Sequence, residues 1–249
     1  MTLANYHTHT TYCDGKNTPE ELIEEAIALG MAELGFSGHS YTDFDSSWCM
    51  SRENTERYRT EIASLKVKYK DKLSIKLGIE QDYLSDEFPV GYDFVIGGVH
   101  WVKKDGVYIP VDESAEILCD AIEKHYGGDI YALCEDYYTA VGDLYNRTGC
   151  DIIAHFDLVT KFNEGDTLFD TNNKRYKDAV RGALDILLKA PVLFEINTGA
   201  ISRGYRTEPY PSADIIKIIK ENSGKLILSS DCHDKKNLCF EFNKYKDLI

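Results

Sequence analysis

No stretch of the 249-residue sequence approaches the roughly 20 consecutive apolar residues that a membrane-spanning helix needs, and no basic segment followed by an apolar one marks a secretory signal. The sequence also lacks a tandem repeat, a low-complexity tract and a linker rich in proline, glycine or serine. A chain of this length can bury one sizeable core. We therefore expect a soluble protein, without membrane partners, that folds as a single domain over residues 1–249.

The seven cysteines are scattered, and no two have the C-x-x-C spacing. This argues against a disulfide framework and against a zinc ribbon, and it favours a protein of the reducing cytoplasm. Cys13 and Cys232 stand next to candidate ligands described below. On a strand, however, the side chain of Cys232 faces away from Asp231 and His233. We predict that both cysteines are structural thiols.

The sequence also lacks an excess of basic residues. Its formal net charge is −14, which repels the phosphate backbone of nucleic acids unless basic residues cluster on one face. The densest basic stretch is KVKYKDK at 66–72, at the end of an apparent helix, where cations complement the helix dipole and face solvent. We expect no nucleic-acid partner. The sequence does not indicate an oligomeric state.

What the sequence does contain is an alternation of short apolar runs with helical segments, which is typical of βαβ units and a parallel sheet. The apolar runs predict seven strands, at residues 3–8, 33–39, 74–80, 93–100, 151–155, 192–197 and 225–233. The connection before the fourth strand is short and carries Pro89 and Gly91, so we expect no helix there.

Helices are predicted from caps and periodicity. Thr18 followed by Pro19 is a start signal for a helix that ends near Gly30. A second helix would place Tyr58, Ile62, Leu65 and Tyr69 on one face. Further helical patterns cover residues 113–126, 130–147 and 211–224.

Six of the seven histidines lie at or just beyond the C-terminal end of a predicted strand: His7, His9, His39, His100, His155 and His233. If the strands are parallel and close into a barrel, these ends open on one face, where barrel enzymes place their active sites. Glu80, Asp231 and Asp14 would join the histidines there. The sequence thus predicts a cavity that contains six imidazoles and three carboxylates.

Such a set is unstable without cations, because buried carboxylates repel one another and imidazoles lack partners. Nine ligands suit two or three divalent ions, and mixed imidazole and carboxylate ligation is compatible with zinc, manganese or iron. His7 and His9, one residue apart on a strand, project from the same face and can chelate. A single histidine or an isolated H-x-H is more often structural, as we predict for His125, so the interpretation depends on the combination.

These residues resemble the motifs of the PHP (polymerase and histidinol phosphatase) family. The motifs stand here as His7-x-His9 with Asp14, Gly38-His39-Ser40, the isolated His155, and Asp231-x-His233, with Glu80 in LGIE and His100 in GGVH as intervening ligands. The similarity extends from residue 7 to residue 233.

The resemblance implies a distorted (β/α)7 barrel, similar to a TIM barrel, with a trinuclear metal centre. By the same resemblance, His7, His9, Glu80 and Asp231 would hold one metal. Glu80 would bridge to a second metal held by His100 and His155, and a third would use Asp14, His39 and His233.

A free-standing chain of this size is similar to the monofunctional histidinol phosphatases of histidine biosynthesis. Residues 195–212 resemble the stretch of those enzymes in which an arginine meets the phosphate, a role that we assign to Arg203, with Arg206 as second candidate. Lys161 could add a phosphate contact. The aromatic candidates for the organic end of the substrate are Trp101, Tyr205 and Tyr210.

The expected reaction is hydrolysis of L-histidinol phosphate by a hydroxide that bridges two metals, without a phosphoenzyme. Arg203 would neutralise charge, and Asp231, His233 or His39 would serve the leaving group. Three alternatives stay open: a PHP phosphatase that acts on protein phosphotyrosine or nucleotides, a non-catalytic metal-binding or interaction module, and amidohydrolase chemistry. The last usually needs a bridging lysine, and none stands at a predicted strand end.

Overall fold

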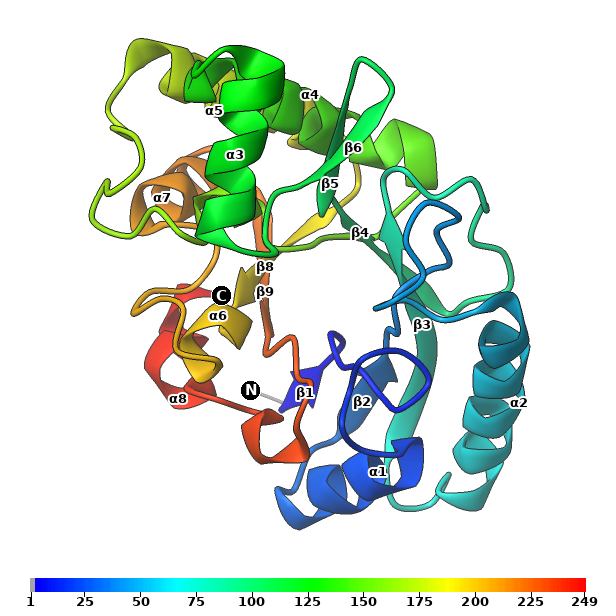
Figure 1. Ribbon diagram of the computed structural model, residues 1–249. Helices are drawn as coiled ribbons and strands as arrows, with labels where there is room; N and C mark the ends of the chain where they lie inside the picture. The colour runs from blue at the N-terminus through cyan, green and yellow to red at the C-terminus, as the bar shows by residue number, and fades with distance from the viewer. Residues whose placement is uncertain (1–2) are drawn as a thin grey trace.

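The computed structural model describes residues 3–249 and contains a sheet of seven parallel strands, with helices outside it (Figure 1). The strand order is β1-β2-β3-β4-β7-β8-β9. The bounds are β1 Ala4–Asn5, β2 Glu33–Phe36, β3 Ser74–Asp82, β4 Phe94–Gly98, β7 Ile152–Ile153, β8 Leu193–Asn197 and β9 Lys225–Ser229. The predicted parallel α/β architecture is confirmed.

The sheet curls until its first and last strands meet. Thr8 forms an isolated parallel bridge with Cys232, supported by hydrogen bonds from the amide of His9 to the carbonyl of Cys232 (2.8 Å) and from the amide of Cys232 to the carbonyl of His7 (3.2 Å). Nearer the strand starts, the Asn5 side chain joins the two edges, since its amide nitrogen donates to Ser230 Oγ at 2.6 Å. The result is a nearly closed barrel.

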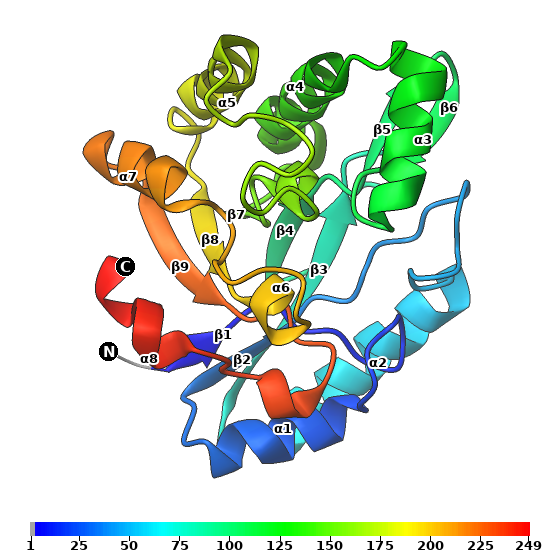
Figure 2. The same cartoon turned by 60° about the vertical axis from the view of Figure 1, so that its left-hand side comes forward.

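The longer helices cover the outside of this barrel, as a turned view makes clear (Figure 2). Their bounds are α1 Pro19–Ala28, α2 Arg52–Lys68, α3 Ala115–Tyr126, α4 Ile130–Thr148, α5 Lys174–Leu187 and α7 Ala213–Glu221, with short helices α6 Gly199–Ser202 and α8 Phe242–Tyr245. Among residues 3–249, no helix combines the length and apolar character needed to cross a membrane.

Local sequence explains two of the helix positions. At the start of α1, the Thr18 side chain accepts from the amide of Glu21 while the Glu21 carboxylate accepts from the amide of Thr18, a capping box with proline at the first position. In α2, the predicted face is buried, with Tyr58 and Ile62 fully enclosed. The apolar periodicity therefore fixes which side of α2 packs on the sheet.

The structure also contains elements that the sequence patterns did not predict. A β-hairpin, β5 Trp101–Lys104 and β6 Val107–Pro110, follows the fourth barrel strand, and α5, α6 and α8 were not predicted. Several barrel strands are shorter than expected. The predicted strand 33–39 ends at Phe36, but an isolated parallel bridge between His39 and Glu80 continues the pairing beyond its end.

Asn5 provides a test of barrel closure, because its buried side chain makes four hydrogen bonds. Its amide nitrogen donates to Ser230 Oγ and to the carbonyl of Leu238, and its oxygen accepts from the amides of His7 and Ser230. We predict that Asn5→Ala lowers the free energy of unfolding by roughly 2–4 kcal/mol, since it leaves buried partners unpaired. Urea denaturation measures this effect.

The control for this prediction is Asn146→Ala. Asn146 is exposed on α4, and its amide contacts only Asp143 among the described residues. We expect a change within about 0.5 kcal/mol for this variant. Equal stability losses in the two variants would contradict the role of Asn5 at the barrel closure.

Candidate metal centre

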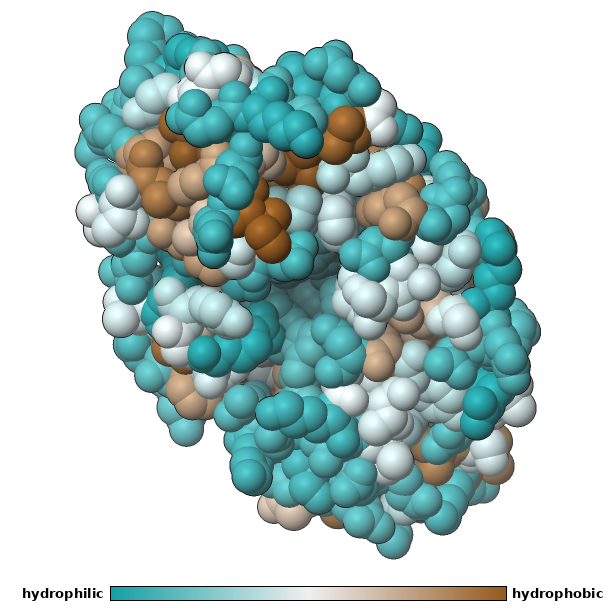
Figure 3. Space-filling view, viewed as in Figure 1, coloured by the Kyte–Doolittle hydropathy of each residue, from teal (hydrophilic) through white to brown (hydrophobic). Residues whose placement is uncertain are grey.

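All nine predicted ligands converge at the C-terminal ends of the barrel strands. Seven of them line a cavity of about 410 Å³, whose opening is visible as a hydrophilic hollow near the middle of the face in Figure 3, and the other two, His7 and His9, are buried beside Glu80. This volume falls within the range of small-molecule sites. The parallel order of the strands brings together residues from position 7 to position 233, as the sequence predicted.

Glu80, near the end of β3, lies at the centre of the cluster, and only 1% of its surface is exposed. Both carboxylate oxygens face imidazole nitrogens. Around Oε2 these are His39 Nδ1 at 2.9 Å, His7 Nε2 at 3.1 Å and His9 Nε2 at 3.5 Å; around Oε1 they are His155 Nε2 at 3.0 Å and His100 Nε2 at 3.3 Å. One carboxylate thus connects five imidazoles.

A glycine allows this approach. Gly98 is the last residue of β4, and a Cβ atom built there would lie 3.0 Å from Glu80 Oε1 and 3.0 Å from the ring of His100. Any larger residue at this position would displace the carboxylate or the imidazole. The second glycine of the GGVH motif is therefore part of the site geometry.

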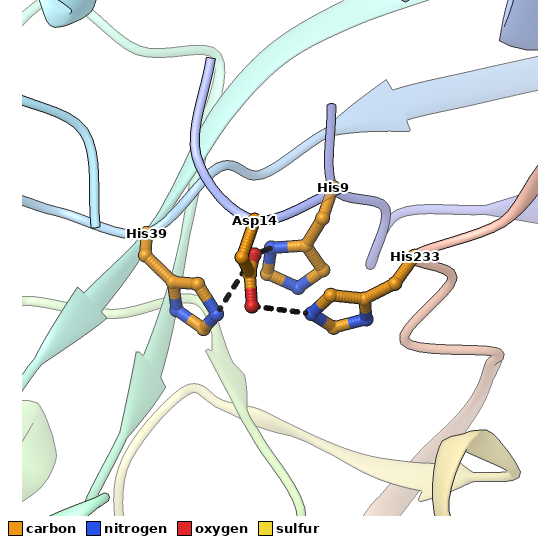
Figure 4. Close-up of side chains that lie close together, drawn as sticks. All are labelled: His9, Asp14, His39 and His233. Carbon is orange, nitrogen blue, oxygen red and sulfur yellow. Dashed lines mark hydrogen bonds and ion pairs between the residues drawn. The ribbon is translucent and has the colours of Figure 1, made fainter. Parts of the chain in front are cut away.

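The other two carboxylates extend the cluster toward solvent. Asp231 Oδ1 lies 3.3 Å from His9 Nε2, and the Asp231 backbone is in the left-handed region with φ of 47°. In Figure 4, the imidazoles of His9, His39 and His233 surround the carboxylate of Asp14. Asp14 Oδ2 is 3.1 Å from His233 Nε2, and its Oδ1 is 3.7 Å from His39 Nε2.

Two carboxylates behind the cluster were missed by the sequence reasoning. Glu195 on β8 lies 2.7 Å from His7 Nδ1, and Asp82 at the end of β3 lies 3.1 Å from His100 Nδ1. Each holds the ring nitrogen that faces away from Glu80. A signal existed for both: Glu195 is a charged residue inside the apolar run VLFEIN, and Asp82 closely follows Glu80 at a strand end.

Electrostatics keeps the cluster charged despite its burial. Burial raises the pKa of Glu80, but His7, His39 and His100 lower it by more, so that it lies well below the usual range. Burial also raises the pKa of Asp231, and Arg203 and His7 bring it well below normal. Burial lowers the pKa of His9 to about 3, so that this ring stays neutral and can serve as a ligand.

The donor atoms fit divalent cations. Among residues 3–249, the buried atoms without a hydrogen-bond partner include His7 Nε2, His9 Nε2, His39 Nδ1 and Glu80 Oε2, all of which face the same space. Tetrahedral ligands at about 2.05 Å from zinc lie about 3.3 Å apart, which matches the separations of 2.9–3.5 Å around Glu80 Oε2.

Within residues 3–249, three groups of side chains have ligand atoms close enough to hold an ion. They are His9 with Asp14, His39 and His233; His7 with His9 and Glu80; and His39 with Glu80 and His100. The division of ligands among individual metals that the resemblance implies stays a prediction.

Four of the predicted substrate residues line the same cavity: Arg203, Lys161, Trp101 and Tyr205. Arg203 follows α6, and its guanidinium donates to Asp231 Oδ2 at 3.0 Å and to the Asp231 carbonyl at 2.9 Å. Lys161 Nζ donates to the carbonyl of Asp112 at 2.6 Å and lies 4.6 Å from the centre of the Tyr205 ring. Both cations therefore stand on the wall of the metal cavity.

The substrate contacts predicted for Arg206 and Tyr210 do not match the positions of these side chains in the structure. Arg206 is turned away from this cavity and lines a separate one, where its guanidinium donates to the side chain of Thr160 and lies 4.7 Å from the Tyr210 ring centre. Tyr210 is 1% exposed and packs in the core. The chain turns between 203 and 206, so the two arginines point into different cavities, and a phosphate contact by Arg206 is not supported.

Cys13, Cys232 and His125 have surroundings that fit the structural roles predicted for them. Cys232 is fully buried, and Cys13 Sγ lies 3.6 Å from His9 Nδ1, where burial raises the thiol pKa to about 12. His125 lies in the last turn of α3, apart from the cluster. Trp48 was not predicted, yet it lines the cavity, with its ring centre 4.6 Å from that of His39.

Comparison with known families agrees with this geometry. The PHP domain matches residues 5–199. The chain belongs to the PHP domain family. The match covers seven of the nine predicted ligand positions, from His7 to His155. The other two, Asp231 and His233, lie beyond it, just after the end of β9.

Relatives of this PHP protein carry a consistent name. The histidinol-phosphatase of Bacillus subtilis is 26% identical over 271 residues, which span 96% of each protein. Among solved structures, a Listeria monocytogenes protein assigned to the histidinol phosphatases superposes with a TM-score of 0.82 at 21% identity and covers 97% of this chain and 99% of its own.

The histidinol phosphate phosphatase of Lactococcus lactis, solved with zinc, L-histidinol and phosphate, has a TM-score of 0.68 at 22% identity. The superposition covers 100% of this chain and 92% of the other. These likenesses confirm the PHP barrel fold that the sequence resemblance implied.

Glu80 offers a direct test of the metal centre. We predict that the purified protein contains two or three divalent ions per chain and that Glu80→Gln loses at least one, because both oxygens of the carboxylate face several imidazoles. Inductively coupled plasma mass spectrometry measures the metal content. His125→Ala is the control and should keep all ions. Full metal content in Glu80→Gln would contradict the central position of this residue.

Proposed function

We propose that this PHP protein is a metal-dependent phosphomonoesterase that hydrolyses L-histidinol phosphate to L-histidinol and phosphate. The observation that carries the proposal is the nine-residue ligand cluster, seven members of which line a small-molecule cavity together with Arg203. The substrate is supported by the name that the Bacillus subtilis relative carries and by the ligands in the Lactococcus lactis structure.

The cofactors we propose are two or three divalent ions, with zinc as the first candidate because the Lactococcus lactis structure contains it. Held by these residues, the ions would supply an activated water as nucleophile and would offset the negative charge of the phosphate. The ligand set also accommodates manganese or iron. The positive charge of the bound ions would explain how a chain with net charge −14 can bind an anionic ester.

Arg203 is the proposed phosphate-binding residue. Its guanidinium is anchored on Asp231 by two hydrogen bonds, and it lies 3.0 Å from His233 Nδ1, so it is held at the edge of the ligand cluster. A planar guanidinium can donate two parallel hydrogen bonds to phosphoryl oxygens. In this position it neutralises charge that develops on the equatorial oxygens during the reaction. Lys161, which lines the same cavity, would add a point charge.

Other residues that line the cavity suit the organic end of the proposed substrate. Asp45, Asp112 and Glu113 line it together with Trp101 and Tyr205. Histidinol carries an ammonium group and an imidazole that can be protonated, and carboxylates attract both. The aromatic rings supply flat apolar surface for the imidazole.

The leaving alkoxide needs a proton, and His233 is the residue that we propose to supply it. Its side chain is 20% exposed, against 8% for both His39 and Asp231, so it is the most accessible of the three candidates. His233 Nδ1 lies 3.0 Å from an Arg203 N–H donor and 3.0 Å from the carbonyl oxygen of Asp231, which hold the ring in place at the edge of the cluster.

We further propose that residues 1–249 form one domain and that the enzyme is cytoplasmic. In support of one domain, the first and last strands belong to the same sheet and meet at the Thr8–Cys232 bridge. In support of a reducing compartment, the seven cysteines are free thiols.

A substrate panel tests the proposed activity. Protein reconstituted in turn with zinc, manganese and iron should release phosphate from histidinol phosphate with kcat/KM above about 10⁴ M⁻¹s⁻¹. Tyrosine phosphate and nucleoside monophosphates should be cleaved at least 100-fold more slowly. Equal slow cleavage of every ester would refute the substrate assignment and leave the metal centre standing.

Arg203 provides a second test. We predict that Arg203→Ala lowers kcat/KM for histidinol phosphate by roughly 100- to 1000-fold, because it removes a donor that faces the phosphoryl oxygens. The control is Arg175→Ala on α5, whose guanidinium binds Asp129 and Glu135 at the surface. Steady-state kinetics with both variants measures the difference. Unchanged kinetics in Arg203→Ala would remove this residue from the substrate site.

A further inference from the structure

Glu195 is a buried carboxylate that belongs to none of the three groups able to hold an ion. It lies in β8, is 1% exposed, and uses both oxygens. Its Oε1 is 2.7 Å from His7 Nδ1, and its Oε2 accepts from the amide of His155 at 3.2 Å and from the side-chain amide of Asn197 at 3.0 Å. Two predicted metal ligands thus share one acceptor group.

The direction of these hydrogen bonds is fixed by the surroundings. The backbone amide of His155 can only donate. The Asn197 side chain must also present its NH2 group to Glu195, because its oxygen accepts from the amide of Gly199 at 2.9 Å. A carboxylate accepts only, so the third contact requires that His7 Nδ1 carries a proton and donates it to Oε1.

This arrangement determines the state of the other ring nitrogen. When the neutral ring of His7 has its proton on Nδ1, its Nε2 has a free lone pair. That atom lies 3.1 Å from Glu80 Oε2 and 3.7 Å from Asp231 Oδ1, in the centre of the cluster, and it has no hydrogen-bond partner among the described residues.

We propose that Glu195 is the positioning residue that sets the tautomer and orientation of His7 and thereby makes Nε2 available to a metal ion. The proposal rests on the metal centre proposed above and not on the identity of the substrate. Asp82 holds His100 Nδ1 at 3.1 Å in the same manner, so the two sides of the Glu80 carboxylate are supported alike.

The variant Glu195→Gln has a side chain of almost the same shape, but it reverses the direction of the hydrogen bond between residue 195 and His7 Nδ1. Two donors, from His155 and Asn197, point at the position of Oε2, so the oxygen of the glutamine amide must occupy it. Its NH2 group then faces His7 Nδ1, which must accept a hydrogen bond. The neutral ring of His7 then carries its proton on Nε2, where it blocks metal binding.

The experiment measures zinc alone, by competition with a chromophoric chelator, in the wild type and in Glu195→Gln. We expect the variant to bind the affected zinc roughly 10- to 100-fold more weakly. Long-range ¹H–¹⁵N spectra of the [¹⁵N]histidine-labelled, zinc-treated proteins report the tautomer. His7 should be protonated on Nδ1 in the wild type and on Nε2 in the variant. Unchanged zinc affinity together with an unchanged tautomer would overturn the proposal.

A matched control is Asp151→Asn. The Asp151 carboxylate accepts from the amide of Val95 at 2.9 Å at the opposite end of the barrel, and an asparagine oxygen can still accept there. It carries the same loss of charge and should leave zinc affinity within twofold. An equal loss in both variants would mean that net charge, and not the tautomer, is responsible, and it would contradict the proposal.

A second variant covers the case in which Glu195→Gln does not fold. Glu195→Asp keeps the carboxylate, so it should retain the Nδ1 proton of His7 and bind zinc more tightly than the glutamine variant. Loss of that tautomer in Glu195→Asp would refute the proposal. Failure of the wild type itself to bind zinc would contradict the metal centre, a result distinct from a failure confined to Glu195.

Discussion

The structure depends on one electrostatic constraint: a buried carboxylate must be surrounded by groups that stabilise its charge. The two oxygens of this carboxylate face five imidazoles. Glu80 is 1% exposed, and an ionised carboxylate at such a depth is costly unless cations or donors surround it. Every strand that contributes to the cluster must end at the same level for the imidazoles to reach it. The parallel barrel provides this, since its strand ends meet on one face, and the Thr8–Cys232 bridge brings the first ligand pair and the last together.

The same constraint would resolve the contrast between the charge of the chain and that of the proposed substrate. A net charge of −14 opposes phosphate, but divalent ions held by Glu80, Asp231 and Asp14 would offset these carboxylates. The proposed ions would make the cavity locally positive, and Arg203 would extend that region along the wall. The carboxylates of Asp45, Asp112 and Glu113, which line the same cavity, would attract the cationic end of the proposed substrate.

The sequence predicted the seven barrel strands and the nine residues of the cluster, because histidine at the end of an apolar run is an unusual pattern that repeats along the chain. It did not predict the β5–β6 hairpin, whose strands are only four residues long, although the spacing of Tyr176, Val180, Ala183 and Leu187 could have revealed α5. The directions of Arg203 and Arg206 depend on a turn after α6 and could not be read from spacing. Glu195 was missed because it lies inside a strand and not at its end.

We infer above all that the Glu80 carboxylate and the surrounding imidazoles bind metal ions. Anomalous X-ray diffraction from crystals of the zinc-loaded protein, recorded on both sides of the zinc absorption edge, tests it most directly. We predict at least two anomalous peaks in the cavity, with an oxygen of Glu80 about 2.0–2.2 Å from one of them. Absence of peaks there, or peaks that leave Glu80 without a bound ion, would contradict it.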